Sequence, residues 1–239
     1  MGPSSLVHLA QRRRRPELMD QPGLDAGEHA RALRGLGRIN RLSLSDAILW
    51  PAVARLAHDS GGAPIRVLDL ASGGGDVPIA LACRAARASL NLRVEGCDIS
   101  RGAVHFARQR AIERGVAVRF FTLNALADSI PKGYDVLTCS LFLHHLDEAD
   151  AVRLLRKMAD AARRLVLVDD LVRGRLGYAL AWAGCRLLSR SPIVRHDGPV
   201  SVSSAFTPAE VRELAKRAGL EGVSLTRHWP RRFLLSWSP

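Results

Sequence analysis

The segment Val67-Leu-Asp-Leu-Ala-Ser-Gly-Gly-Gly-Asp76 decides how this sequence is interpreted. It begins within a short apolar run, residues 65–70, which follows Pro64 and has the composition of a buried strand. The glycine cluster comes where such a strand turns into the next helix. Because glycine has no Cβ atom, the backbone can pass close to a ligand there. The segment therefore predicts a ligand site at the carboxyl end of the first strand of an α/β sheet.

Two common phosphate-binding motifs do not fit this glycine cluster. The dinucleotide fingerprint G-x-G-x-x-G, started at Gly73 and Gly75, needs a third glycine where Pro78 stands. No Gly-Lys-Ser/Thr follows the cluster, which excludes a P-loop. The pattern does not predict a nucleotide held by its phosphates.

A carboxylate follows the second predicted strand, residues 92–99. Asp98 stands near its end, where a carboxylate can accept both hydroxyls of a ribose. A glycine turn with a ribose carboxylate and no phosphate cradle favours an adenosyl ligand without phosphates. S-adenosylmethionine fits this description, and its sulfonium suits the nearby Asp69 and Asp76.

Strands alternate with helices around this segment, which predicts a parallel sheet covered on both faces. Helical spacing covers residues 27–57, and an insert with a helix and an irregular loop interrupts the alternation at 171–205. A capping box at Thr207 then starts a helix. The predicted strands are 65–70, 92–99, 116–123, 134–141 and 164–170, followed by a hairpin of 222–229 and 231–237 around Pro230.

On these residues the sequence resembles the class I S-adenosylmethionine-dependent methyltransferases, especially those of ubiquinone and menaquinone biosynthesis. The resemblance covers residues 64–170 closely and continues in architecture to the end. It implies a Rossmann-like α/β fold with a seven-stranded, mostly parallel sheet, a C-terminal antiparallel hairpin, and S-adenosyl-L-methionine as cofactor. It also implies cofactor contacts in the glycine turn and after strands two, three and four: Asp69, Ala71, Ser72, Gly73, Gly75, Asp98, Ile99, Asn124, Ala125 and Ser140.

The sequence departs from the family pattern at three places. Ala71 stands where the family's first glycine usually is, and Asn124 replaces an acidic residue that binds the adenine amine. We expect Asn124 to supply an acceptor oxygen instead. The customary Pro-Gly-Gly before strand five is replaced by residues 160–164, a turn away from the cofactor. None of these changes excludes the assignment.

The motifs of other methyltransferase classes are missing. No Asn/Asp-Pro-Pro-aromatic motif of amino-group enzymes is present, and Cys139 lies in an apolar strand without the proline that RNA cytosine enzymes need before their nucleophile. Asp169 and Asp170 resemble part of the metal site of catechol-type enzymes, but the partner on strand four is missing. We therefore expect no metal site and a small-molecule acceptor.

Three histidines are candidates for the general base. His144 and His145 lie in the loop where the methyl group would point, and Asp197 can orient His196 to take a phenol proton. All three also fit non-catalytic roles in the cofactor pocket or in a polar loop. Because the sulfonium is already activated, alignment and desolvation can supply much of the rate without a strong base.

The segments before and after the core predict a cover for the acceptor. Residues 19–63 form a helical cap, 64–170 the cofactor-binding core, 171–205 an acceptor lid, and 206–239 a closing helix and hairpin. Residues 25–43 resemble methyltransferases that accompany type III polyketide synthases, which favours an aromatic, lipophilic acceptor methylated on oxygen rather than carbon. Within the cap, Arg38 could bind the cofactor's carboxylate. The apolar part of the lid lies among arginines and could also contact a membrane surface.

Composition leaves partners open. The 239 residues carry a net charge of +12, which favours an RNA methyltransferase as one alternative function. A second alternative is a protein that binds the cofactor without turnover. Four cysteines without a CxxC pair predict free thiols, and no apolar run is long enough to span a membrane, so we expect a cytoplasmic monomer or homodimer. Residues 1–18 are basic and are expected to form a disordered arm.

Overall fold

The computed structural model of the chain describes residues 7–20, 25–42 and 45–239. Within them, seven strands form a sheet in the order β3-β2-β1-β4-β5-β7-β6, in which β7 is antiparallel to β5 and β6 and the other pairs are parallel. This confirms the predicted fold class. The strands are β1 (Ile65–Leu70), β2 (Leu92–Asp98), β3 (Arg119–Thr122), β4 (Tyr134–Ser140), β5 (Ala162–Leu171), β6 (Ser224–His228) and β7 (Arg232–Trp237).

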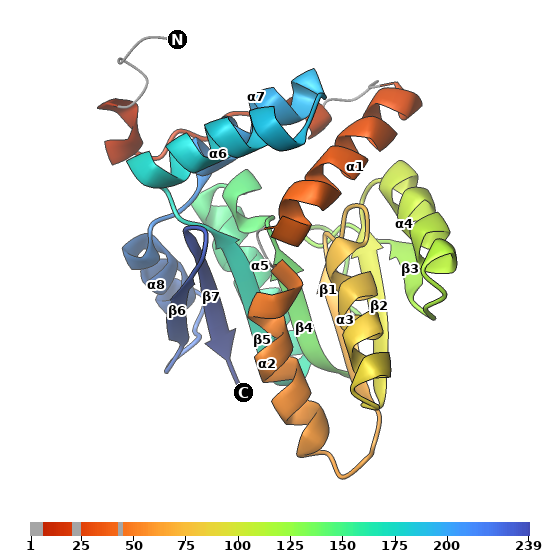
Figure 1. The fold of residues 1–239 in the computed structure, drawn as a ribbon. Helices are drawn as coiled ribbons and strands as arrows, with labels where there is room; N and C mark the ends of the chain where they lie inside the picture. Colours follow the sequence, from red (N-terminus) through yellow and green to blue (C-terminus); the bar gives the residue numbers. More distant parts are fainter. Residues whose placement is uncertain (1–6, 21–24, 43–44) are drawn as a thin grey trace.

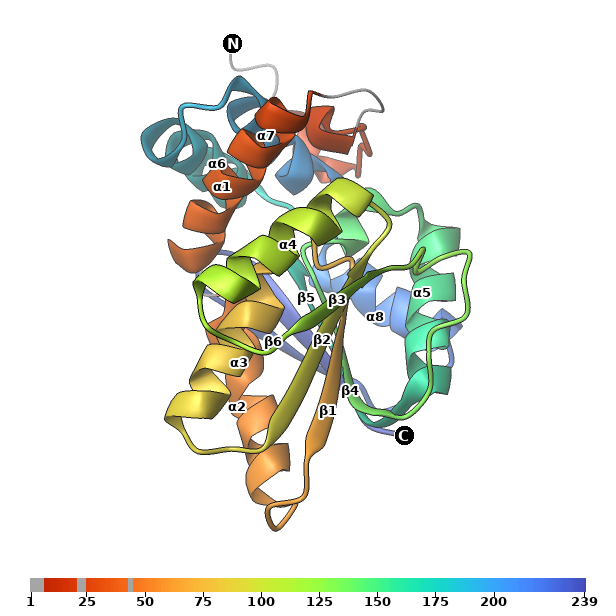
Figure 2. The ribbon, with the colours of Figure 1, turned by 90° about the vertical axis from the view of Figure 1, so that its right-hand side faces the viewer.

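Helices cover both faces of the sheet (Figure 2). On one face lie α2 (Ser45–His58), α3 (Asp76–Arg87) and α4 (Arg101–Glu113), and on the other lie α5 (Glu148–Ala161) and α8 (Pro208–Arg217). Because the central strands are buried from both sides, apolar residues occupy successive positions in them, as in Val67-Leu68 of β1 and Val136-Leu137 of β4. The predicted capping box of α8 is present, with Thr207 and Glu210 each bonding the other's backbone N–H.

Three helices lie above the carboxyl ends of the parallel strands, namely α1 (Ala26–Leu42), α6 (Arg175–Leu188) and α7 (Pro192–Ser204) (Figure 1). The insert was expected to contain a helix and an irregular loop, but it forms the two helices α6 and α7. Pro192 stands at the start of α7, where its missing N–H costs nothing, and Pro199 is accommodated inside the helix. Among the described helices, none combines the length and apolar character that crossing a lipid bilayer requires.

The N-terminal segment corrects a second expectation. Residues 7–20, here called the N-terminal strap, include the short turns η2 (Val7–Ala10) and η3 (Leu18–Asp20) and lie against the body of the protein. Arg12 donates from Nε to the Ser204 carbonyl at 2.6 Å, and its guanidinium lies 3.6 Å from the centre of the Phe206 ring. The predicted disorder is therefore wrong for residues 7–18, because the arginines find backbone carbonyls and a ring as partners. Residues 1–6 lie outside the described residues.

Candidate active site

A cavity of about 990 Å³ lies between the carboxyl ends of the central strands and the cap helices. Its floor comes from the glycine turn and the residues after β2 and β4, and its roof from α1, α6 and α7. The strap closes one side through Glu17 and Met19. Its position at the switch point of the sheet is where open α/β sheets bind ligands.

Asp98 holds the glycine turn in place. One of its carboxylate oxygens accepts the Gly73 N–H at 2.8 Å, and the other accepts the Ser100 N–H at 2.9 Å. A Cβ atom added at Gly73 would meet no heavy atom within 4 Å, so this residue borders open space in the cavity. Asp98 therefore joins the loop to the end of β2 at the predicted ribose position.

Three positions of the turn, Ala71, Gly73 and Gly75, adopt backbone angles that favour glycine. Ala71 has φ 52°, which explains why a glycine is usual there; the left-handed conformation costs alanine roughly 1 kcal/mol. Gly75 has φ 75° and does not line the cavity. A Cβ atom there would lie 2.7 Å from the Phe120 ring and 2.9 Å from Ala107, so Gly75 permits α4 and β3 to pack against the turn. Its predicted direct contact with the cofactor is not supported.

Asp69 is buried beneath the turn. The Thr138 hydroxyl donates to its Oδ1 at 2.6 Å, because Asp69 and Thr138 are paired between β1 and β4. Burial raises the pKa of Asp69 to about 7, and the nearby Asp98 carboxylate adds to that increase. The protonation of Asp69 therefore changes near neutral pH, in the floor of the cavity.

The residues predicted to lie beside the adenine line the cavity, and one of them needs a correction. Ile99 lines the cavity and is 65% exposed, so its side chain is available to an apolar ring. Asn124 and Ala125 also line the cavity. The Asn124 Oδ1 atom, however, accepts the N–H groups of residues 126 and 127 at 3.0 and 3.1 Å. These bonds use both lone pairs of that oxygen, which was expected to accept the adenine amine.

Ser140 carries an unsatisfied group at the end of β4. In the described part of the chain its Oγ atom is buried without a hydrogen-bond partner, and the residue lines the cavity, as Ser72 does. Leu141 follows with φ 55°, a backbone conformation that bulky residues rarely adopt. Buried polar groups are nearly always paired, so the Ser140 hydroxyl fits a contact with a ligand.

His144 is held between two carboxylates. Its Nδ1 atom lies 2.7 Å from Asp170 Oδ1, its backbone N–H donates to Asp170 Oδ2 at 2.9 Å, and its Nε2 atom lies 3.5 Å from Glu17 Oε1. Burial by itself lowers the pKa of His144, but Asp170 and Glu17 outweigh burial and raise it to about 10. This increase favours the protonated ring, which does not fit the predicted role of general base.

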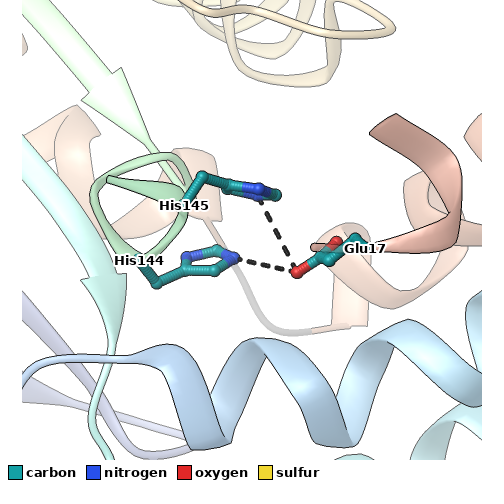
Figure 3. A group of neighbouring side chains, drawn as sticks. All are labelled: Glu17, His144 and His145. Atoms are coloured by element: carbon teal, nitrogen blue, oxygen red, sulfur yellow. Dashed lines mark ion pairs between the residues drawn. The ribbon is translucent and has the colours of Figure 1, made fainter. Parts of the chain in front are cut away.

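His145 and Glu17 complete the cavity wall next to His144 (Figure 3). The His145 Nε2 atom lies 3.9 Å from Glu17 Oε1, and the Ser201 hydroxyl donates to the same oxygen at 2.5 Å. Glu17 is only 6% exposed. Sequence analysis missed it because it follows the arginine block of the strap and shows no periodicity.

His196 and Arg38 lie outside the cavity. The His196 ring contacts Asp197 at 2.9 Å and its side chain is 48% exposed, while the Asp197 carboxylate accepts the N–H groups of Leu18 and Met19. Asp197 therefore anchors the strap and also contacts His196, but His196 does not line the cavity where a general base would act. Arg38 donates to the Leu188 carbonyl at 3.0 Å, which joins α1 to the end of α6.

The two carboxylates at the end of β5 have cationic partners. Asp169 forms a fully buried ion pair with Arg232, whose Nε atom donates at 2.9 Å, and Asp170 binds His144. Cys139, predicted to be a core residue, is fully buried in β4, and burial raises the pKa of its thiol. These groups form the support beneath the cavity.

Known proteins resemble this arrangement. The family model of a methyltransferase domain matches residues 67–164. A ubiquinone biosynthesis O-methyltransferase of Ralstonia nicotianae is 34% identical over 67% of this chain and 64% of its own length, and one of Pseudomonas aeruginosa is 30% identical over 68% and 67%. The solved apo structure of the S-adenosylmethionine-dependent methyltransferase SibL aligns with a TM-score of 0.63 and 26% identity, over 96% of this chain and 64% of that one.

The chain belongs to the class I S-adenosylmethionine-dependent methyltransferases. The chain spans slightly less than two thirds of the Ralstonia relative that it matches. S-adenosyl-L-methionine is the cofactor of this family. The open space at Gly73, the paired oxygens of Asp98 and the unpartnered Ser140 hydroxyl fit that molecule in the methyltransferase described here.

Proposed function

We propose that the chain is an enzyme that transfers a methyl group from S-adenosylmethionine to an oxygen of a small aromatic, lipophilic acceptor such as a polyketide or a quinol. The observation that carries this proposal is that the cavity continues from the glycine turn to an apolar roof, with Leu180, Ala181 and Leu188 of α6 lining it. Curated relatives named as ubiquinone biosynthesis O-methyltransferases support transfer to oxygen.

The bound cofactor supplies an electrophilic methyl group on its sulfonium. In this proposal Asp98 accepts the ribose hydroxyls, the Ser140 hydroxyl binds the methionine part, and Ile99 packs against the adenine. Asp69 provides negative charge beneath the sulfonium when it is ionised. The cap helices exclude water and align the acceptor, which supplies much of the rate of an in-line displacement.

The proposed acceptor contacts lie near α6 and the strap. Of the three predicted bases, only His145 both lines the cavity and is not held between two carboxylates. The exposed Leu176 and Leu187 of α6, at 56% and 84%, support a lipophilic acceptor that approaches from an apolar surface. Methylation of RNA would need a strand to enter beneath α1, α6 and α7.

The experiment is a methylation assay with isotopically labelled S-adenosylmethionine. Phenols and catechols with and without alkyl tails are compared with tRNA, and products are detected by mass spectrometry. We expect label in an alkyl-substituted phenol or catechol, formation of S-adenosylhomocysteine, and loss of both in the Asp98→Ala variant. Label in tRNA that falls steeply with salt would support the RNA alternative instead. Cofactor binding without label in any acceptor would favour the non-catalytic alternative.

A further inference from the structure

We propose that Glu17, His144 and His145 form a binding site for a divalent transition-metal ion in the wall of the cavity. Each residue contributes one potential ligand atom, and the three atoms all lie within 4.8 Å of one another. Figure 3 shows both imidazole rings directed toward the same carboxylate, although Glu17 comes from the strap and the histidines from η4 (Leu143–His145).

The distances are close to those that a metal ion requires. A tetrahedral ion bound at about 2.0–2.1 Å holds neighbouring ligand atoms about 3.3 Å apart. Glu17 Oε1 already lies 3.5 Å from His144 Nε2 and 3.9 Å from His145 Nε2. An approach of about half an ångström by the His145 ring would bring its Nε2 atom to that distance from Glu17 Oε1, and the ligand atoms of the two histidines lie within 4.8 Å of each other. This side chain is 22% exposed and can make that approach more easily than His144, which is 4% exposed.

The surroundings orient two of the three ligands as metal sites do. Asp170 lies 2.7 Å from His144 Nδ1, so the other ring nitrogen points at Glu17. A ligating imidazole must be neutral, so an ion bound there would displace the proton from His144 Nε2 into solvent, and we expect its binding to weaken as the pH falls. A carboxylate on the second nitrogen of a ligating histidine fixes the ring and raises its basicity. Ser201 donates to the Glu17 carboxylate. Asp170 and Ser201 therefore form an outer shell that orients two of the potential ligands, as the outer shell of a metal site does.

The donor set indicates the class of ion. Two imidazoles and one carboxylate suit Zn²⁺, Fe²⁺, Co²⁺ or Mn²⁺, whereas Mg²⁺ prefers oxygen ligands alone. Three protein ligands leave a position open, as in catalytic zinc sites. All three residues line the cavity, so that position faces the space assigned to the acceptor.

The catalytic consequence rests on the proposed function. An acceptor hydroxyl bound to the ion would lose its proton to solvent more readily, because the cation stabilises the oxygen anion. His145 would then be a ligand and not a base. The sequence predicted no metal site, and that prediction considered Asp169 and Asp170 at the end of β5. Both of these carboxylates have cationic partners. The proposed site instead includes Glu17, which lies far from them in sequence.

The test is a Zn²⁺ titration of the chelator-treated full chain by calorimetry, without cofactor or acceptor, followed by Co²⁺ titration with visible absorption. Glu17→Gln and His145→Gln are compared with His196→Gln, which changes an exposed histidine outside the cavity. We expect one ion per chain, and affinity at least about tenfold weaker in the first two variants but unchanged in the third. Binding of S-adenosylhomocysteine by each variant verifies that it is folded.

Three outcomes would overturn the proposal: no Zn²⁺ binding to the unmodified chain, equal binding by Glu17→Gln, or Mg²⁺ binding as tight as Zn²⁺. In any of these cases the cluster is a hydrogen-bonded contact that only fixes the strap. Methyl transfer by a chain that binds no metal would leave the proposed function intact. Metal binding by a chain that methylates no acceptor would leave the metal site intact and contradict the proposed function.

Discussion

Asp98 provides the sharpest test of the cofactor site, because both of its oxygens already bind backbone N–H groups at 2.8 and 2.9 Å. Asp98→Asn keeps the shape but replaces one acceptor by a donor. A hydrogen bond to a charged group contributes about 1.5–3 kcal/mol, and the ribose loses an acceptor as well. We expect affinity for S-adenosylhomocysteine to fall by about 2–3 kcal/mol, or about 30- to 150-fold. Asp98→Ala should lose more.

The assay is calorimetric titration with S-adenosylhomocysteine, which cannot be turned over, together with thermal unfolding of the unliganded protein. Asp128→Asn is the matched control. Its carboxylate accepts the Asn124 N–H at 2.8 Å, so it also holds a turn, but it does not line the cavity. A dissociation constant for Asp98→Asn within twofold of the unmodified protein would refute the ribose assignment. An equal loss in Asp128→Asn would show that only turn geometry was measured.

Three further predictions concern packing, charge and pH. Gly75→Ala should lower the free energy of unfolding, measured in urea, by about 2–4 kcal/mol, because the strain of a positive φ adds to a clash with the Phe120 ring. The control Gly62→Ala, with φ 89° and open space around it, should lose only the backbone part, about 1 kcal/mol, and equal losses in the two variants would exclude the clash. Arg232→Met should lower the free energy of unfolding by about 3–5 kcal/mol in the same measurement, because it leaves Asp169 buried and unpaired. If that is the cause, the double variant with Asp169→Asn should regain stability, and an undiminished loss in the double variant would contradict it. The pKa of Asp69 is raised to about 7, so this carboxyl is mostly neutral below that pH and ionised above it. The affinity for S-adenosylmethionine should therefore rise with pH through about 7 and then level off, and the same rise in Asp69→Asn would show that Asp69 is not its cause.

The sheet and the glycine turn could be predicted because each depends on local pattern. The apolar run 65–70 followed by glycines indicates a strand and a turn wherever it occurs. The same reasoning placed Asp98 at the carboxyl end of β2, beside the turn. Gly75 shows the limit of this approach. Its motif position is that of a cofactor residue, but only the structure shows that its missing Cβ makes room for Phe120.

The cavity wall could not be predicted, because its contacts join distant parts of the chain. Arg12 binds the Ser204 carbonyl across 192 positions, and backbone carbonyls leave no signature in a sequence. The block of arginines therefore suggested a solvated arm. Likewise, part of the irregular loop expected within residues 171–205 is the helix α7, which contains Pro199. The roles of His144 and His196 depended on such distant contacts, through Glu17 and the strap.

The strap has a consequence for the order in which the protein is made. Ser201, which donates to Glu17, is synthesised 184 residues after it. Domains generally fold from the N-terminus as they emerge, but this segment lacks its partners on α7 until that helix exists. The parallel strands β1 to β5 can therefore pair before the cavity is closed on this side. The synthesis of α7 thus determines when the strap can complete its contacts at the cavity wall.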